Sequence, residues 1–150
     1  MITDALLAYL HFAGILMLAA FLGAEALLLR TRPDATTIHT LARADMGYFI
    51  AAILVLGSGA ARLFFGVKGA AFYMGNPLLY VKLGLFLLIG LISIAPTLRF
   101  IRWRKAARAD AAFTPAPAEV KSAKRLVMLE LHLLAFIPLA AVFMARGFGH

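Results

Sequence analysis

The chain has no cysteine, which excludes disulfide bonds, thiolate metal sites and cysteine nucleophiles. Charge is scarce as well: Asp, Glu, Lys and Arg make up 15% of the 150 residues, against about a quarter in an average soluble domain. Apolar residues take their place and account for 63% of the chain. One core of a domain this size cannot hide so much apolar surface. The composition therefore predicts an integral membrane protein.

The short motifs of common soluble enzymes are also missing. The sequence contains no P-loop and no G-x-G-x-x-G, H-E-x-x-H or G-x-S-x-G pattern. Motifs therefore give no reason to expect a nucleotide-binding protein, a zinc protease or a serine hydrolase.

Four apolar segments are long enough to cross a bilayer. A helix rises about 1.5 Å per residue, so about 20 residues span roughly 30 Å of hydrocarbon. Lipid offers no partner to exposed backbone groups, which leaves helices as the way across. We predict an all-α fold, a four-helix transmembrane bundle in contact with the lipid bilayer, formed by a single domain over residues 1–150. The first segment has no basic residue before it, so we expect a span and not a cleaved signal peptide. The predicted spans are 5–29, 46–65, 78–98 and 126–145.

The basic residues are unevenly distributed. The chain has 15 Lys and Arg against 7 Asp and Glu, and eleven of the basic residues lie in two loops, three in 30–45 and eight in 99–125. Loops rich in Lys and Arg stay on the cytoplasmic side. We therefore predict that both loops are cytoplasmic, that both termini are on the outer side, and that the protein is in the bacterial cytoplasmic (inner) membrane. Because topology explains the positive charge, no nucleic-acid partner is expected.

Each predicted span has one basic residue toward or at its outer end. Inserting an ionisable side chain into the membrane costs a few kcal/mol, so such residues are usually retained for a structural or functional role. Four such groups at similar depth predict a pocket for an anionic group beneath the outer face. The alternative is that the long side chains extend to the outer headgroups, and that the histidine is a hydrogen-bonded interior residue and not a haem or metal ligand. The four residues are His11, Arg62, Lys82 and Arg146.

A second group of ionisable residues lies toward the inner side. Glu25 and Glu130 are predicted to form structural ion pairs with Arg43 or Arg125 at the membrane boundary. Glu130 and His132 are about 200° apart around a helix, so both cannot face the bundle centre. Which of the two faces inward is left open.

Helical spacing places several of these residues on common faces. One stripe of the first span ends in Glu25, and Gly14 on that stripe would allow close approach of a partner backbone or a flat ligand. Gly59 and Arg62 likewise share a face of the second span. The stripe on the first span comprises His11, Gly14, Leu18, Leu22 and Glu25.

Several segments resemble a known group of proteins. They are Leu-His-Phe-Ala-Gly at 10–14, Asn-Pro-Leu-Leu-Tyr-Val-Lys-Leu at 76–83, Leu-Glu at 129–130 and Met-Ala-Arg-Gly-Phe-Gly at 144–149. Together they resemble a bacterial family of small uncharacterised four-helix membrane proteins, over nearly the whole chain. That family is distantly similar to HemJ-type protoporphyrinogen oxidases and, more loosely, to CopD-like membrane domains.

The HemJ resemblance implies particular roles. His11 matches the first-helix histidine, Lys82 matches the lysine entering the third helix, and Glu130 matches the Glu of an Asn-Glu pair in which Leu129 replaces Asn. The resemblance implies binding of haem b, oxidation of protoporphyrinogen and transfer of electrons to quinone. HemJ-type chains also have a Trp-x-Ala-Gly-Leu-Phe-Tyr-Leu-Pro-Arg stretch, which residues 16–25 lack. We therefore carry over haem binding and leave the oxidase activity aside.

Our leading hypothesis is a redox protein that binds haem b, or a similar amphipathic anionic ligand, through His11 as the iron ligand. Arg62, Lys82 and Arg146 would hold the anionic end, and a quinone or porphyrin would be the further ligand. One alternative is a non-enzymatic accessory or structural membrane protein. Another is a small transporter that forms a homodimer through the small residues Gly57, Gly59 and Ala60.

Overall fold

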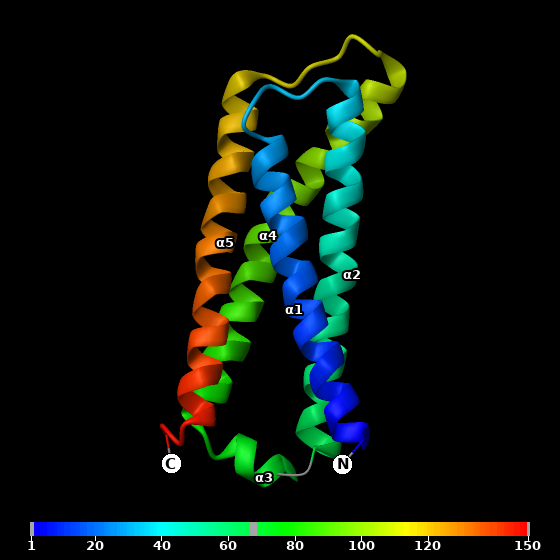
Figure 1. Ribbon diagram of the computed structural model, residues 1–150. Helices are drawn as coiled ribbons and strands as arrows, with labels where there is room; N and C mark the ends of the chain where they lie inside the picture. The colour runs from blue at the N-terminus through cyan, green and yellow to red at the C-terminus, as the bar shows by residue number, and fades with distance from the viewer. Residues whose placement is uncertain (1, 67–68, 150) are drawn as a thin grey trace.

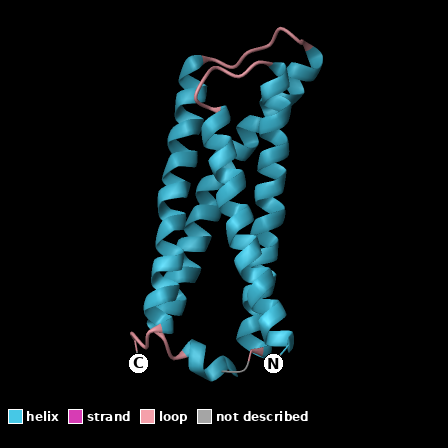
Figure 2. Ribbon diagram, in the orientation of Figure 1, coloured by secondary structure: helices cyan, strands magenta, loops and turns pink. Residues whose placement is uncertain are grey.

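The structure is a computed structural model that describes residues 2–66 and 69–149, except the side chain of Phe72. This part of the chain folds into five helices and contains no strand (Figures 1 and 2). Four of the helices within these ranges are long and apolar enough to cross a membrane. The predicted all-helical transmembrane bundle is confirmed. The helices are α1 (Ile2–Leu28), α2 (Ala35–Phe65), α3 (Gly69–Met74), α4 (Pro77–Ala109) and α5 (Pro117–Ala145).

The long helices run up and down between two distinct ends (Figure 1). Both chain termini and the short helix α3 lie at one end, which we call the terminal end. The links 29–34 and 110–116 lie at the other end, which we call the loop end. Helix α1 packs mainly against α2, and α4 packs mainly against α5. Helix α1 also contacts α5, so the first and last helices of the chain are neighbours in the bundle.

Helices at the loop end are longer than the predicted spans. The predicted loops 30–45 and 99–125 are mostly helical, because α2 begins at Ala35, α4 ends at Ala109 and α5 begins at Pro117. The polar residues of these segments are typical of loops, which is why loops were predicted. Each segment also carries apolar side chains at helical spacing. Ile38 and Trp103, for example, are fully buried. The bundle therefore continues beyond the apolar spans as amphipathic helices.

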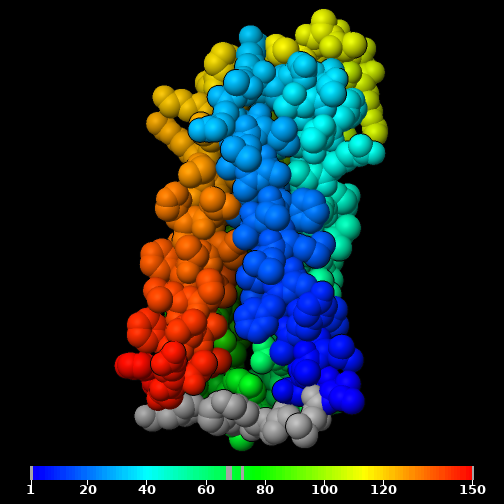
Figure 3. All heavy atoms as spheres, viewed as in Figure 1, coloured from blue at the N-terminus to red at the C-terminus, as the bar shows by residue number. Residues whose placement is uncertain are grey.

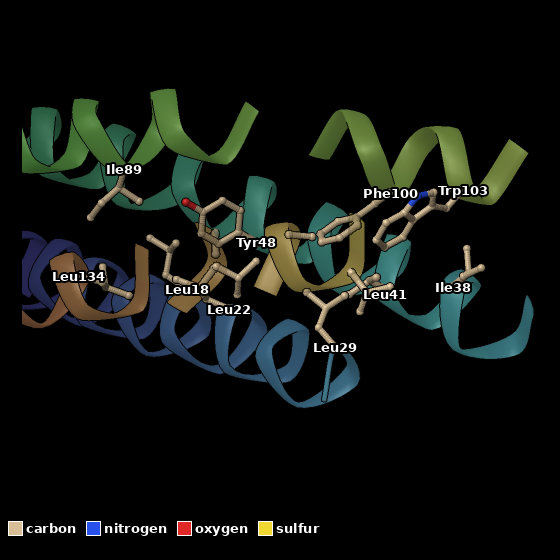
Figure 4. Close-up of a cluster of buried hydrophobic side chains, with 14 of the residues drawn as sticks. Leu18, Leu22, Leu29, Ile38, Leu41, Tyr48, Ile89, Phe100, Trp103 and Leu134 are labelled. Atoms are coloured by element: carbon tan, nitrogen blue, oxygen red, sulfur yellow. The ribbon is translucent and has the colours of Figure 1, made fainter. Parts of the chain in front are cut away.

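The core is concentrated toward the loop end. Phe100 and Trp103 are 0% exposed, and their rings pack at a tilt with centroids 5.7 Å apart (Figure 4). Toward the terminal end, by contrast, no described residue of α1 before Gly14 is buried, and none of α4 before Ile89. Tight packing at one end therefore gives way to a looser arrangement at the other. The larger core side chains are Leu18, Leu22, Leu29, Ile38, Leu41, Tyr48, Ile89, Phe100, Trp103, Val120, Val127 and Leu134.

At the terminal end, a hydrogen bond joins the segments 76–83 and 144–149. Asn76 is fully buried; its side chain accepts a hydrogen bond from the Leu78 amide (2.9 Å) and donates one to the Phe148 carbonyl (2.9 Å). Gly147 and Gly149 have φ values of 85° and 90°, a region that L side chains rarely adopt. The Gly-Phe-Gly ending is therefore required for the chain to turn back onto the start of α4.

The start of α2 allows a test of capping. Asp34 is the N-cap, and its carboxylate accepts a hydrogen bond from the Thr37 amide at 2.8 Å. Hydrogen bonds from Thr37 hold the pKa of Asp34 below its ordinary value. A lowered folded-state pKa stabilises the fold above the unfolded value of about 3.9, and this contribution is lost as pH falls through the folded value. We expect Asp34→Ala to lower the melting temperature at pH 7 and to match wild type at strongly acidic pH. Asp34→Asn, which keeps a capping oxygen, should not show this pH dependence.

Candidate functional site

His11 is held in one orientation by α2. Its Nδ1 atom lies 3.1 Å from the Val55 carbonyl oxygen and 3.1 Å from the Ser58 hydroxyl oxygen. The Ser58 hydroxyl donates its hydrogen to the Leu54 carbonyl at 2.6 Å, so it accepts from His11. Nδ1 therefore carries the proton of the neutral ring. Among the described residues Nε2 has no hydrogen-bond partner, and its lone pair is free.

Two cations lie beside this histidine. Arg62 and Lys82 are half-buried and close enough to His11 and to each other for their charges to interact. The Arg62 Nε atom is buried and has no hydrogen-bond partner within the described ranges. An orphaned guanidinium nitrogen next to a second cation is suited to an anion. The structure thus brings together three of the four predicted outer residues.

Arg146 is the fourth predicted member and does not join the group. It follows α5 and is exposed; its backbone N–H caps the helix, whereas its side chain has no hydrogen-bond or ion-pair partner in the part of the chain described. The sequence placed it at the right end of the bundle, but its position just past the helix directs it to the surface. We define the outer cluster as His11, Ser58, Arg62 and Lys82.

Glycines let α1 and α2 approach closely around the outer cluster. A Cβ on Gly14 would lie 2.9 Å from Val55 Cγ2, and a Cβ on Gly59 would lie 3.1 Å from His11 Cε1. The close approach predicted at Gly14 is therefore that of the neighbouring helix. Gly59 faces His11, so it is used inside the protomer, whereas Gly57 and Ala60 are exposed.

The surface near the terminal end is hollowed. In Figure 3 a recess separates α5 from α1 in this half, with α4 visible at its floor. The described residues lining this half of the bundle are mostly exposed or half-buried. His11 precedes the first buried residue of α1, and Lys82 precedes the first buried residue of α4. The outer cluster therefore belongs to this less tightly packed half.

A second polar group lies in the half toward the loop end. Glu25 and Glu130 are 2% and 1% exposed, and Asp45 is 9% exposed. All three carboxyl groups are close enough to interact electrostatically with one another. Tyr48 donates a hydrogen bond to Glu130 Oε2 (3.2 Å), and Thr97 donates one to Asp45 Oδ1 (2.7 Å). We define the carboxyl cluster as Glu25, Asp45, Tyr48, Thr97 and Glu130.

The expected ion pairs of Glu25 and Glu130 are not formed. Arg43 and Arg125 are both exposed, and the ion pair found among the described residues joins Arg102 to Glu119. The reason is helix phase: the glutamates face the bundle interior, whereas these arginines lie on the outer faces of α2 and α5. Glu25 Oε1 and Glu130 Oε1 are buried without a hydrogen-bond partner in the described part of the chain.

The structure also shows which of Glu130 and His132 faces the bundle interior. Glu130 faces inward, and His132 is exposed with its Nδ1 2.5 Å from the Met128 carbonyl of the same helix. His132 is therefore separate from both clusters.

Sequence reasoning missed Asp45, Tyr48 and Thr97. The sequence pattern puts Asp45 at the end of the predicted loop 30–45, and puts Tyr48 and Thr97 inside predicted apolar spans, where neither stands out. A signal was present, because Asp45 and Tyr48 continue the helical spacing of buried residues along α2. Extending that stripe toward Ser58 would have placed these residues on the same inward face. The stripe includes Ile38, Leu41, Asp45, Tyr48, Val55 and Ser58.

Four apolar helices around buried polar groups define this protein as a multi-pass integral membrane protein. It belongs to the family described as "Predicted membrane protein (DUF2214)", whose model matches residues 3–149. The resemblance to an uncharacterised membrane-protein family is thereby confirmed. No curated protein and no solved structure matches the chain.

Proposed function

We propose that this membrane protein binds haem b, or a similar amphipathic anionic ligand, at the outer cluster and has a redox role. The observation that carries the proposal is the state of His11, whose Nδ1–H is bound to α2 while Nε2 is free. Histidines that ligate metals almost always donate the other ring N–H to a carbonyl or similar acceptor. His11 is already arranged in this way.

The donor set at the outer cluster fits haem. His11 Nε2 would ligate the iron, and the orphaned Arg62 Nε together with Lys82 would hold a propionate. In the part of the chain described, no group of three or more His, Cys, Asp or Glu is arranged to hold a metal ion. Iron at His11 would therefore need to come with its porphyrin. When bound, haem would supply one-electron redox chemistry.

The chain's own residues would orient this ligand. Val55 and Ser58 fix the plane and tautomer of the imidazole, and Gly59 leaves room for its edge. The half of the bundle around His11 is loosely packed, which allows a flat ligand to enter. A quinone or a porphyrin remains our proposed redox partner, and a homodimer remains a proposal for the assembly.

Haem binding is tested by paired histidine variants. We expect His11→Ala, purified from a haem-competent host, to lose haem, and His132→Ala to retain it. Ser58→Ala should keep haem but bind it about 10-fold more weakly, the low end of what loss of a supporting hydrogen bond costs a metal site. The measurements are the Soret absorbance per protein and a haem titration. If His11→Ala retained wild-type haem content, His11 would not be the ligand.

Outcomes without haem would favour the other classes. A wild-type protein that folds well but takes up no haem would be an accessory or structural protein if no solute moves across vesicles containing it. Solute movement without a chromophore would instead identify a transporter.

The proposed topology places the loop end in the cytoplasm and both termini outside. It rests on the eight basic residues of 99–125 and the three of 30–45. Because the chain has no cysteine, single-cysteine labelling has no background. In intact spheroplasts, we expect an impermeant maleimide to label Ala71→Cys, on the exposed side of α3, and not Ala111→Cys, in the link 110–116. After lysis both should react. The reverse pattern in intact cells would invert the topology and refute a cytoplasmic loop end.

A further inference from the structure

The carboxyl cluster brings acidic groups from three helices together in the half of the bundle toward the loop end. Glu25 comes from α1, Asp45 from α2 and Glu130 from α5, and each pair interacts electrostatically. Three ionised carboxylates in a low-dielectric interior would repel one another strongly. The arrangement requires positive charge from some source.

The basic residues that the structure describes do not supply that charge. Arg43 on α2 and Arg125 on α5 are exposed. On α4, Arg99 donates to the Ser122 hydroxyl at 2.8 Å, and Arg102 pairs with Glu119. The side chains that hydrogen-bond to the carboxyls, Tyr48 of α2 and Thr97 of α4, are neutral donors. A bound cation must therefore balance the cluster.

Two carboxyl oxygens are available for that cation. Glu25 Oε1 and Glu130 Oε1 have no hydrogen-bond partner in the described ranges, although the two residues are only 2% and 1% exposed. An ionised carboxylate only accepts hydrogen bonds, whereas a protonated carboxyl also donates one. These oxygens are therefore sites where a proton can be held.

A proton fits this cluster better than a metal ion. Calcium takes six to eight oxygen ligands and magnesium close to an octahedral set, as hard cations do. The described side chains include no group of three or more His, Cys, Asp or Glu with the geometry for a metal ion. Apolar side chains also flank the cluster; Figure 4 shows Tyr48 between Ile89 and Phe100, above Leu18 and Leu22.

We propose that Glu25, Asp45 and Glu130 form a proton-binding site within the bundle, and that Asp45 is the point at which protons exchange with the surroundings. Asp45 is the most exposed of the three carboxyls at 9%, and its partner Thr97 is half-buried. Glu25 and Glu130 lie deeper and hold the proton. The site is independent of haem, because it uses none of the residues of the outer cluster.

Infrared spectroscopy of the protein in lipid vesicles at pH 7 tests the proposal. A protonated carboxyl has a C=O stretching band that shifts when D2O replaces H2O. We expect this band in wild type and a loss of at least half of its area in Glu25→Gln or Glu130→Gln. Glu119→Gln, which removes the carboxyl paired with Arg102, is the matched control and should leave the band unchanged. Absence of the band in wild type would overturn the proposal, as would its survival at full area in both cluster variants.

A second measurement keeps the proposal testable if a glutamine variant does not fold. In Asp45→Asn we expect the band to remain but its shift in D2O to slow by at least 10-fold. An unchanged exchange rate would overturn the role of Asp45. Sodium or calcium added at constant ionic strength should not change the melting temperature, whereas stabilisation by either ion would show a metal site in place of a proton site.

Discussion

Phe100→Ala is expected to lower the free energy of unfolding by about 3–5 kcal/mol, the range for loss of a buried aromatic side chain. Phe100 is 0% exposed and packs against Trp103 at the loop end, where the helices extend past the predicted spans. Removing the ring would leave a cavity beside the largest side chain of the core. Trp103 is the chain's single tryptophan, so its fluorescence reports the change directly. The measurement is a denaturant titration in mild detergent.

The matched control is another phenylalanine on the outside of the bundle. Phe49 is 59% exposed on α2, so Phe49→Ala removes a similar side chain without opening a cavity. We expect it to cost less than about 1 kcal/mol, as surface substitutions usually do. Equal effects of the two substitutions would show that the buried core at the loop end is not where this bundle gains its stability.

Gly14→Leu is expected to be the second most damaging substitution. A Cβ at Gly14 would lie 2.9 Å from Val55 Cγ2 and 3.4 Å from the Val55 backbone nitrogen, so α1 and α2 would have to separate. Overpacking of this kind costs about 1–3 kcal/mol, occasionally more. Separation would also move His11, one turn away, from Val55 and Ser58. We expect lower stability and lower haem affinity together.

Gly23 provides the control for this substitution. It lies on the same helix, and a Cβ there would meet nothing within 4 Å. Gly23→Leu should leave both stability and haem affinity close to wild type, or raise stability slightly because leucine favours helix more than glycine does. A Gly14→Leu protein that melts like Gly23→Leu would contradict the close α1–α2 packing.

The fold could be predicted largely from hydropathy, whereas the helix ends could not. Spans such as 78–98 follow from long, predominantly apolar sequence, because the bilayer demands helices of that length. Helix α4 continues to Ala109 through a basic segment, since Phe100 and Trp103 on one face find a core to enter. Hydropathy averages both faces of a helix and so hides an amphipathic extension.

The outer cluster was partly predictable, because residues at matching depth on the inward faces of neighbouring helices lie close together. His11, Arg62 and Lys82 satisfy that condition, and Arg146 lies just beyond its helix and does not. The partners of the buried glutamates were harder to predict. Counting charges suggested arginines, but helix phase places Asp45 and Tyr48 inward instead.

The measurement that tests the central claim most directly is the absorption spectrum of the detergent-purified wild-type protein, air-oxidised and then reduced with dithionite. The protein should come from a haem-competent host and then be titrated with haem. We predict a Soret band and an α-band that sharpens on reduction, both absent in His11→Ala. A well-folded protein with no visible absorption and no haem uptake would contradict a haem site at His11.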